Sequence, residues 1–298
     1  MAAIEVRQLT KTFGSEVAVD GLSFEVTEGS ITGFVGPNGS GKTTTLRAIV
    51  GLVFPDAGEA LVNGLPYPQM PKPSSEVGAL LEGNDFHPGR SARRHLRVLA
   101  SAVGVPRKRV DEVLDLVGLT EHAERRVKGF SLGMRQRLGL AGALLAQPKT
   151  LILDEPANGL DPDGIRWLRN LLREHAARGG TVLLSSHVIA ELALSADHLV
   201  VIKQGRLVAQ GAVAELAGGT DHRQFVRVRT PAPELLLEAL AAAGIPAKTD
   251  GENEVVALDA SPEQVGQVVS RSGIVVYEMQ MDRPRLEDVI LELTKESN

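Results

Sequence analysis

The chain has 298 residues, which is enough for one large domain and one small domain. Apolar residues make up 43% of the chain and aromatic residues only 3%, so we expect a globular core filled by Leu, Val, Ile and Ala. The absence of cysteine excludes disulfides, thiolate metal sites and cysteine nucleophiles. The net charge of -5 argues against a nucleic-acid partner, which usually requires a basic face.

Membrane-spanning and secretory segments are not predicted. No apolar run approaches the roughly 20 residues that a spanning helix needs, and the N-terminal residues lack the basic start of a signal peptide. The most apolar window, residues 138–146, is short and is flanked by Arg137 and Lys149, which is typical of a buried helix. We therefore expect a cytoplasmic protein, or one that is held at a membrane only through a partner.

Residues 4–35 predict short strands joined by turns, because apolar and polar residues alternate there. The last of these strands runs directly into a glycine-rich turn, and a helix is expected after it at 43–50. Residues 55–75 are loop-rich, with five prolines, and enclose a short strand at 60–62. Helical patterns then dominate from residue 90 to residue 148.

From residue 150 onward, strands alternate with helices. Strands are expected at 150–153, 181–185 and 199–202, and helices at 164–177 and 188–193. Such alternation predicts a parallel α/β sheet, into which the helical stretch 90–148 is inserted between two strands.

The composition shifts at Gly218 and Gly219, where we place a domain boundary between residues 1–218 and 219–298. Beyond it the pattern predicts strands and helices in alternation, at 224–228, 233–243, 254–258, 262–271, 274–279 and 284–293. We expect a small α+β domain there, with a ferredoxin-like arrangement as a candidate.

A phosphate-binding loop is predicted at Gly36-Pro37-Asn38-Gly39-Ser40-Gly41-Lys42-Thr43, between a predicted strand and a predicted helix. Glycines let the backbone curl so that its N–H groups face inward, and the helix adds its positive N-terminal end. Lys42 would reach the β- and γ-phosphates, and the Thr43 hydroxyl could ligate Mg²⁺. The alternative is a glycine-rich turn without a function.

Two adjacent acids, Asp154 and Glu155, follow the apolar strand at 150–153. Open α/β sheets bind ligands at the carboxyl ends of their strands, where these two carboxylates would lie. Asp154 is then a candidate for the Mg²⁺ shell, and Glu155 could polarise a water for attack on the γ-phosphate. Taken alone, the pair could equally be an exposed acidic turn.

A third segment, residues 130–137, places Ser131 at the start of a predicted helix. In isolation, Ser131 is best explained as a helix cap. The cap is compatible with a ligand site, because a capped helix start offers N–H groups and a hydroxyl to an anion.

Residues 1–215 resemble the ABC (ATP-binding cassette) ATPases, whose motifs occur here in the family's order. The matching positions are Phe13 at the aromatic that stacks on adenine, 36–43 at Walker A, 131–135 at the signature motif, 151–155 at Walker B, 158–161 at the D-loop and His187 at the switch histidine. Without its spacing behind Walker B, His187 would be interpreted as a structural histidine. An ordinary core aromatic remains the alternative for Phe13.

The resemblance implies a P-loop NTPase fold, in which a RecA-like core carries an N-terminal antiparallel β-subdomain and an inserted helical subdomain at about 85–148. It implies ATP and Mg²⁺ as cofactors. The catalytic residues would be Lys42, Glu155 and His187, and the metal ligands Thr43, Asp154 and Glu82. The nucleotide would be bound by Phe13, Gly36, Pro37, Asn38, Gly39, Ser40, Gly41, Lys42, Thr43, Thr44, Ser131, Gly133 and Asp161.

Two departures from the family pattern are present. The signature motif reads Phe-Ser-Leu-Gly-Met from Phe130 to Met134, where the family usually has Leu-Ser-Gly-Gly-Gln. Glu82, after the strand at 77–81, stands where the family has a glutamine. A carboxylate there can still meet Mg²⁺ or water, but it adds negative charge near the phosphates. Both departures resemble the drug- and bacitracin-resistance branch of bacterial exporters.

The resemblance also implies a head-to-tail dimer with a second copy of the chain. Each ATP would lie on the P-loop of one copy and under the Ser131 segment of the other, with Asp161 communicating across the interface. A separate transmembrane permease would hold the dimer at the inner face of the cell membrane, and ATP-driven closure would drive export. Phe86 is a candidate permease contact, with local packing as the alternative. Four arginines could face anionic lipid or form a solvated helix face, namely Arg90, Arg93, Arg94 and Arg97.

Two other functions are alternatives to transport. A soluble ABC ATPase of translation, DNA repair or cluster assembly is disfavoured by the single cassette and by the absence of long coiled coils and zinc cysteines. A regulatory module with vestigial hydrolysis is disfavoured because Glu155 and His187 are both present.

Overall fold

The structure is a computed structural model that describes residues 2–81, 86–189, 192, 194–218, 225–282 and 290. The chain divides into two compact units, the first ending at Ala212 and the second beginning at Val213. Helix α8 (Val213–Gly218) therefore belongs to the second unit. Each unit is described by itself below.

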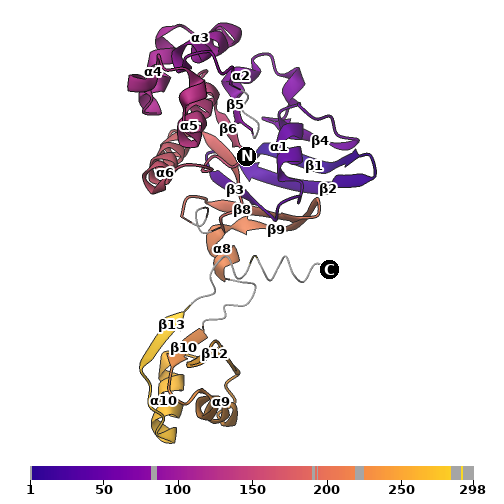
Figure 1. Cartoon of the computed structure of the whole chain (residues 1–298). Helices are drawn as coiled ribbons and strands as arrows, with labels where there is room; N and C mark the ends of the chain where they lie inside the picture. Colours follow the sequence, from indigo (N-terminus) through magenta and orange to yellow (C-terminus); the bar gives the residue numbers. More distant parts are fainter. Residues whose placement is uncertain are drawn as a thin grey trace. The chain divides into compact units, whose positions relative to one another are not determined.

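The first unit is built on a six-stranded sheet (Figure 1). Its order is β5 (Val77–Leu80), β6 (Thr150–Leu153), β7 (Thr181–Ser186), β3 (Ile31–Val35), β8 (His198–Lys203) and β9 (Arg206–Ala212). The first five strands are parallel and β9 is antiparallel. Residues of β3, β6 and β7 are all buried, as expected of apolar runs inside a parallel sheet. The predicted parallel α/β core is confirmed.

A three-stranded antiparallel sheet accompanies this core, in the order β2 (Glu16–Thr27), β1 (Ala2–Phe13) and β4 (Ala57–Val62). The expected short strands are in fact two strands of 12 residues each. Register shifts interrupt their pairing, which explains why the alternation of apolar and polar residues breaks along the sequence. The two sheets share one apolar core, in which Ile4 and Leu22 pack with Phe34 and Leu183.

Helices complete the first unit. Helix α1 (Lys42–Ile49) follows the P-loop, α2 (Pro73–Glu76) precedes β5, and α6 (Pro162–Ala177) lies between β6 and β7 in the chain. The insertion between β5 and β6 contains α3 (Ala92–Val103), α4 (Lys108–Leu116) and α5 (Leu132–Ala143), as predicted. Single 3₁₀ turns lie at Tyr67–Gln69 (η1), Thr120–His122 (η2) and Val127–Gly129 (η3).

The second unit contains a four-stranded antiparallel sheet of order β11 (Ala247–Thr249), β12 (Glu254–Leu258), β10 (Phe225–Arg229) and β13 (Glu278–Asp282). Helices α9 (Pro233–Ala242) and α10 (Pro262–Ser272) alternate with the strands. This strand–helix–strand–strand–helix–strand order is that of the ferredoxin-like, split βαβ arrangement. The predicted helix at 284–293 lies outside the described residues, apart from Ile290.

One strand of the second unit was predicted in the wrong place. The pattern predicted a strand at 274–279, whereas β13 runs from Glu278 to Asp282. Helix α10 ends on Gly273, whose φ of 63° turns the chain back. Ile274 and Val276 then pack on the core of this unit from a non-strand segment, so their apolar character does not mark a strand.

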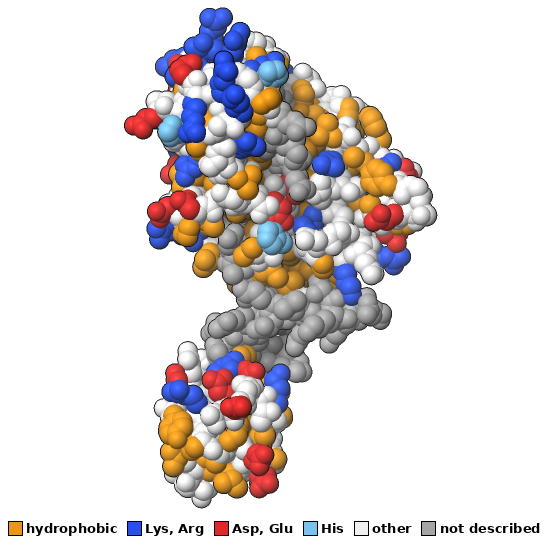
Figure 2. All heavy atoms as spheres, viewed as in Figure 1, with side chains coloured by type: hydrophobic (Ala, Val, Ile, Leu, Met, Phe, Trp, Pro, Cys, Tyr) orange, Lys and Arg blue, Asp and Glu red, His pale blue; other side chains and the backbone are white. Residues whose placement is uncertain are grey.

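No helix in the part of the chain that the structure describes is long and apolar enough to cross a membrane. Figure 2 shows Lys and Arg side chains gathered over α3 and α4. Of the four arginines singled out above, Arg93 forms ion pairs with Asp111 and Glu124. Arg94 and Arg97 instead line an open groove on the helical subdomain.

His95 on α3 is a titratable group held against apolar surroundings. Its ring meets the Phe86 ring edge-on at a centroid distance of 5.0 Å, so Phe86 makes a local packing contact. The Nδ1 atom of His95 is buried and has no hydrogen-bond partner within the described residues. Burial lowers the pKa of His95 from its ordinary value of 6.5, and the nearby Arg90 cation lowers it further.

We therefore expect His95 to make the fold sensitive to acid. Between the lowered pKa and 6.5 the unfolded chain binds more protons than the folded chain, so the free energy of unfolding falls as the pH drops through 6.5. Denaturant titrations at about pH 7.5 and 5.5 should show a smaller loss in His95→Gln than in the wild type. His122→Gln, which changes an exposed histidine, is the control. An equal loss in the wild type and His95→Gln would contradict this prediction.

Candidate active site

The P-loop connects the end of β3 to α1 and curls tightly against two neighbouring strands. Gly41 precedes α1 with a φ of 98°, in the left-handed region that favours glycine. A Cβ at Gly41 would collide with the carbonyl oxygen of Ala18, and one at Gly36 with that of Ile202. These two glycines are therefore required by the close approach of backbone to backbone.

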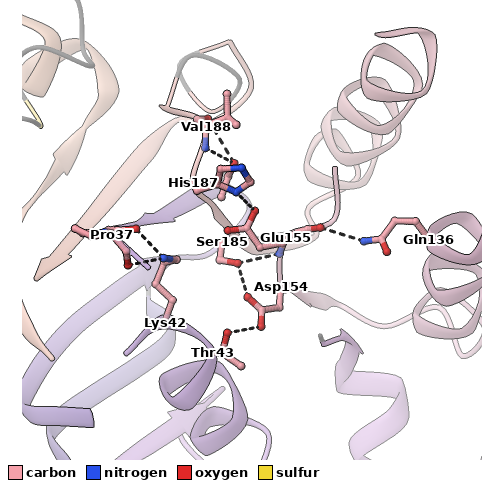
Figure 3. Close-up of polar contacts among 11 residues, drawn as sticks. Pro37, Lys42, Thr43, Gln136, Asp154, Glu155, Ser185, His187 and Val188 are labelled. Carbon is pink, nitrogen blue, oxygen red and sulfur yellow. Dashed lines mark hydrogen bonds and ion pairs between the residues drawn. The ribbon is translucent and has the colours of Figure 1, made fainter. Parts of the chain in front are cut away.

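Two polar side chains lie inside this loop. The Lys42 ammonium donates hydrogen bonds to the carbonyl oxygens of Gly36 (2.7 Å) and Pro37 (3.0 Å), as Figure 3 shows. Burial lowers the pKa of Lys42, and the Glu155 and Asp154 carboxylates oppose that shift. The buried Ser40 hydroxyl has no hydrogen-bond partner in the described part of the chain. An anion in the loop could satisfy both groups.

Asp154 follows β6 and is 3% exposed. One of its oxygens accepts a hydrogen bond from Thr43 Oγ1 (2.8 Å), and the other accepts one from Ser185 Oγ (2.6 Å). Thr43 and Asp154 thus supply adjacent oxygen donors of the kind that Mg²⁺ prefers. The described residues contain no cluster of three or more acids or histidines for a metal, so a Mg²⁺ here needs water or phosphate ligands as well. Glu82, the other predicted ligand, lies outside the described residues.

Glu155 contacts the predicted switch histidine directly. Its Oε2 lies 2.8 Å from Nδ1 of His187, which follows β7 (Figure 3). The Glu155 backbone has a φ of 48°, which a non-glycine residue rarely adopts. The backbone is therefore strained at the residue that the sequence predicts to be catalytic.

These groups line one cleft with a volume of about 520 Å³. Figure 2 shows acidic, basic and histidine side chains meeting at the centre of this face of the first unit. Phe13 also lines the cleft. This residue is 51% exposed, which rules out the alternative of a core aromatic. Of the predicted residues, the cleft gathers Phe13, Asn38, Gly39, Gly41, Lys42, Thr43, Thr44, Asp154, Glu155 and His187.

Six predicted nucleotide-binding residues do not line this cleft. Gly36, Pro37 and Ser40 belong to the P-loop itself, and the other three are Ser131, Gly133 and Asp161. Ser131 caps α5, where its hydroxyl accepts a hydrogen bond from the Met134 N–H. Gly133 packs so closely that a Cβ would lie 2.8 Å from the carbonyl oxygen of Gly159. Asp161 caps α6 by accepting a 2.8 Å hydrogen bond from the Gly164 N–H. Each of the three therefore has a structural role within its own chain.

Two side chains that bond Asp154 or Glu155 were missed in the sequence. Ser185 bonds both Asp154 and the Glu155 N–H, and Gln136 donates a 3.1 Å hydrogen bond to the Glu155 carbonyl oxygen (Figure 3). The sequence signal for Ser185 is weak, namely a hydroxyl residue at the end of an apolar strand. Gln136 lies within the third segment, residues 130–137, but nothing in that segment marked it as a partner of Glu155.

A strand–loop–helix phosphate cradle facing two acids and a histidine defines a P-loop nucleotide hydrolase of the ABC type. The ABC transporter family model matches residues 19–158, and a model described as Domain of unknown function (DUF8746) matches residues 224–287. YhcH of Bacillus subtilis, an uncharacterized ABC transporter ATP-binding protein, is 37% identical over 99% of this chain and 96% of its own length. The chain belongs to the family of ABC transporter ATP-binding proteins. It is an ATP-binding subunit and an ATPase.

Further relatives and solved structures agree with this assignment. The bacitracin transport ATP-binding protein BcrA of Bacillus licheniformis is 41% identical over 70% of this chain and 69% of its own length. The Nod factor export ATP-binding protein I of Paraburkholderia xenovorans is 36% identical over 98% of this chain and 97% of its own length. A solved ATP binding subunit of an ABC transporter has a TM-score of 0.67 at 28% identity, covering 74% of this chain and 94% of that one.

The P-loop geometry predicts unequal effects for two glycine substitutions. Gly39→Ala adds only left-handed backbone strain, about 1–2 kcal/mol, because a Cβ there meets nothing within 4 Å. Gly41→Ala adds the same strain and a collision with the Ala18 carbonyl oxygen, so it should lower thermal stability further and abolish ATP binding. Thermal unfolding and binding of a fluorescent ATP analogue would measure both. Equal behaviour of the two variants would contradict the requirement for close approach.

Proposed function

We propose that this chain acts as a head-to-tail dimer that couples ATP hydrolysis to export through a separate membrane permease. The observation that carries the proposal is the division of the predicted nucleotide-binding residues. Most of them line one cleft, whereas Ser131, Gly133 and Asp161 do not line it. A second copy of the chain that brings its Ser131 segment to this cleft would complete the site.

The start of α5 is suited to that role. Helix α5 has 12 residues, and its N-terminus carries a partial positive charge that favours phosphate. Ser131 is exposed, and Leu132 is 61% exposed, so the segment is accessible to a second copy. ATP would then contact two surfaces at once and hold the dimer closed until hydrolysis removes the γ-phosphate contacts.

Mg²⁺ is the metal that the oxygen donors of this site fit best. Thr43 and Asp154 would hold it, with Glu82 as a further predicted ligand, and it would neutralise phosphate charge when bound. Lys42 would contact the β- and γ-phosphates. Glu155 would accept the proton of the attacking water, and His187, already bonded to Glu155, would orient that carboxylate and the γ-phosphate.

No helix among the described residues could span a membrane. A transport ATPase of this kind would require a separate permease to form the path across the membrane. The subunit would then lie at the inner face of the cell membrane, bound through that permease. Export is the direction that the names of the bacitracin and Nod factor relatives support. A soluble non-transport ATPase or a regulatory ATP-binding module is the alternative, and the transport names of the relatives count against both.

Lys42→Ala tests the phosphate cradle. The substitution removes the ammonium that would contact the phosphates, so ATP hydrolysis should fall by about 100-fold or more. The measurement is phosphate release at saturating ATP, together with the Kd for ATP. Lys149→Ala, which removes an exposed lysine paired with Glu76, is the matched control. Normal turnover by Lys42→Ala would refute the assignment of the P-loop.

Glu155→Gln tests the dimer. The amide keeps the size of the side chain but cannot accept the proton of water, so ATP should bind and remain unhydrolysed. The variant should therefore accumulate as a dimer with Mg²⁺ and ATP, which size-exclusion chromatography with light scattering can detect. The double variant with Lys42→Ala should stay monomeric. A Glu155→Gln protein that is monomeric with bound ATP would refute the shared site.

A further inference from the structure

The backbone of Glu155 needs an explanation of its own. Glu155 follows β6 with a φ of 48°, a conformation that side-chain-bearing residues avoid. Such a conformation persists only where the surroundings hold it in place. Two side chains from different elements bond the backbone of Glu155, one at its N–H and the other at its carbonyl oxygen (Figure 3).

Ser185 bonds the backbone N–H of Glu155. Strands β6 and β7 are parallel, with Leu153 opposite Leu184, so the register carries Ser185 next to Asp154. Ser185 Oγ accepts a 2.9 Å hydrogen bond from the Glu155 N–H and donates one of 2.6 Å to Asp154 Oδ1. Ser185 is fully buried, so water cannot replace either bond. This position needs a group that donates and accepts at once, as a hydroxyl does.

Gln136 bonds the backbone carbonyl of the same residue, in the peptide group that follows. Its Nε2 donates a 3.1 Å hydrogen bond to the Glu155 carbonyl oxygen, which also accepts the Asn158 N–H at 3.1 Å. Gln136 lies on α5, the helix that Ser131 caps. The position of this helix is therefore linked directly to the backbone of Glu155.

We infer that Ser185 and Gln136 are positioning residues that together form a clamp on the Glu155 backbone, one on each side of its Cα. This inference rests on the proposed role of Glu155 as the proton acceptor. Ser185 is the fixed half of the clamp, because it sits in the central sheet beside Asp154. Gln136 is the half that moves with α5, so the position of Glu155 depends on where the Ser131 segment lies. Engagement of that segment by the nucleotide of a second copy would thus align Glu155 in the first copy.

Ser185→Ala tests the fixed half. Loss of a positioning group next to catalytic residues typically costs about 10–100-fold, and we expect this fall in kcat with a change in KM for ATP of less than about threefold. Ser185→Thr keeps a hydroxyl and should restore most of kcat. A normal kcat, or an equal loss in Ser185→Ala and a well-folded Ser185→Thr, would overturn this half of the clamp.

Gln136→Ala tests the moving half. This variant should bind ATP as the wild type does, yet show a lower kcat and a Hill coefficient for ATP closer to 1 than that of the wild type. Gln136→Glu, which has no N–H to donate, should behave like Gln136→Ala. Gln69→Ala, at an exposed glutamine of the 3₁₀ turn η1, is the matched control. Unchanged kcat and unchanged cooperativity in both Gln136 variants would overturn the link through α5.

The Glu155→Gln protein separates failure of the clamp from failure of the proposed function. If Glu155→Gln hydrolyses ATP normally, Glu155 is not the proton acceptor. The proposed function and the clamp then both fail, because the clamp has no catalytic residue to position. If Glu155→Gln is inactive while Ser185→Ala and Gln136→Ala both turn over normally, the proposed function stands and the clamp is wrong. Thermal unfolding of each variant confirms that a fall in kcat comes from folded protein.

Discussion

The parallel pairing of β6, β7 and β3 is the constraint on which the rest of the site depends. Strand β7 pairs with β3 on one side and with β6 on the other, so all three end at the same edge of the sheet. The P-loop leaves β3 there, Asp154 and Glu155 leave β6, and His187 leaves β7. Segments that are more than 100 residues apart in the chain therefore meet without any long loop having to be ordered.

This geometry explains which residues of the site can be predicted from the sequence and which cannot. The P-loop was predictable because its function is carried by its own backbone and by three side chains within eight residues. Ser185 and Gln136 were not predictable, because their partner lies 30 and 19 residues away and depends on strand register and helix placement. The left-handed backbone of Glu155 left no trace either, since no glycine marks it. In the second unit, the misplaced β13 shows that apolar residues can serve the core without forming a strand.

The signature segment shows how one residue can serve structure and ligand binding together. Gly133 needs to be a glycine because a Cβ there would lie too close to the Gly159 carbonyl oxygen. The unusual Leu132 packs against Gly159 so tightly that a Cβ there would collide with its side chain. The signature segment and the D-loop of one chain are therefore locked together. A second copy that engages one of them would also engage the other, which favours a concerted closure over independent movements.

The cleft holds two groups whose hydrogen-bonding needs are only partly met by the chain itself. Lys42 satisfies its charge with two loop carbonyl oxygens, although burial lowers its pKa, and the Ser40 hydroxyl beside it has no partner among the described residues. A phosphate would give the ammonium an opposite charge, which favours its protonated form, and would give the hydroxyl an acceptor. If the Lys42 ammonium turned to the phosphate, the Gly36 and Pro37 carbonyl oxygens would lose their hydrogen-bond donor. The cost of that loss is small because the loop is open to water at Pro37. The loop is thus organised for an anion before the anion arrives, so little of the binding free energy is lost in rearranging it.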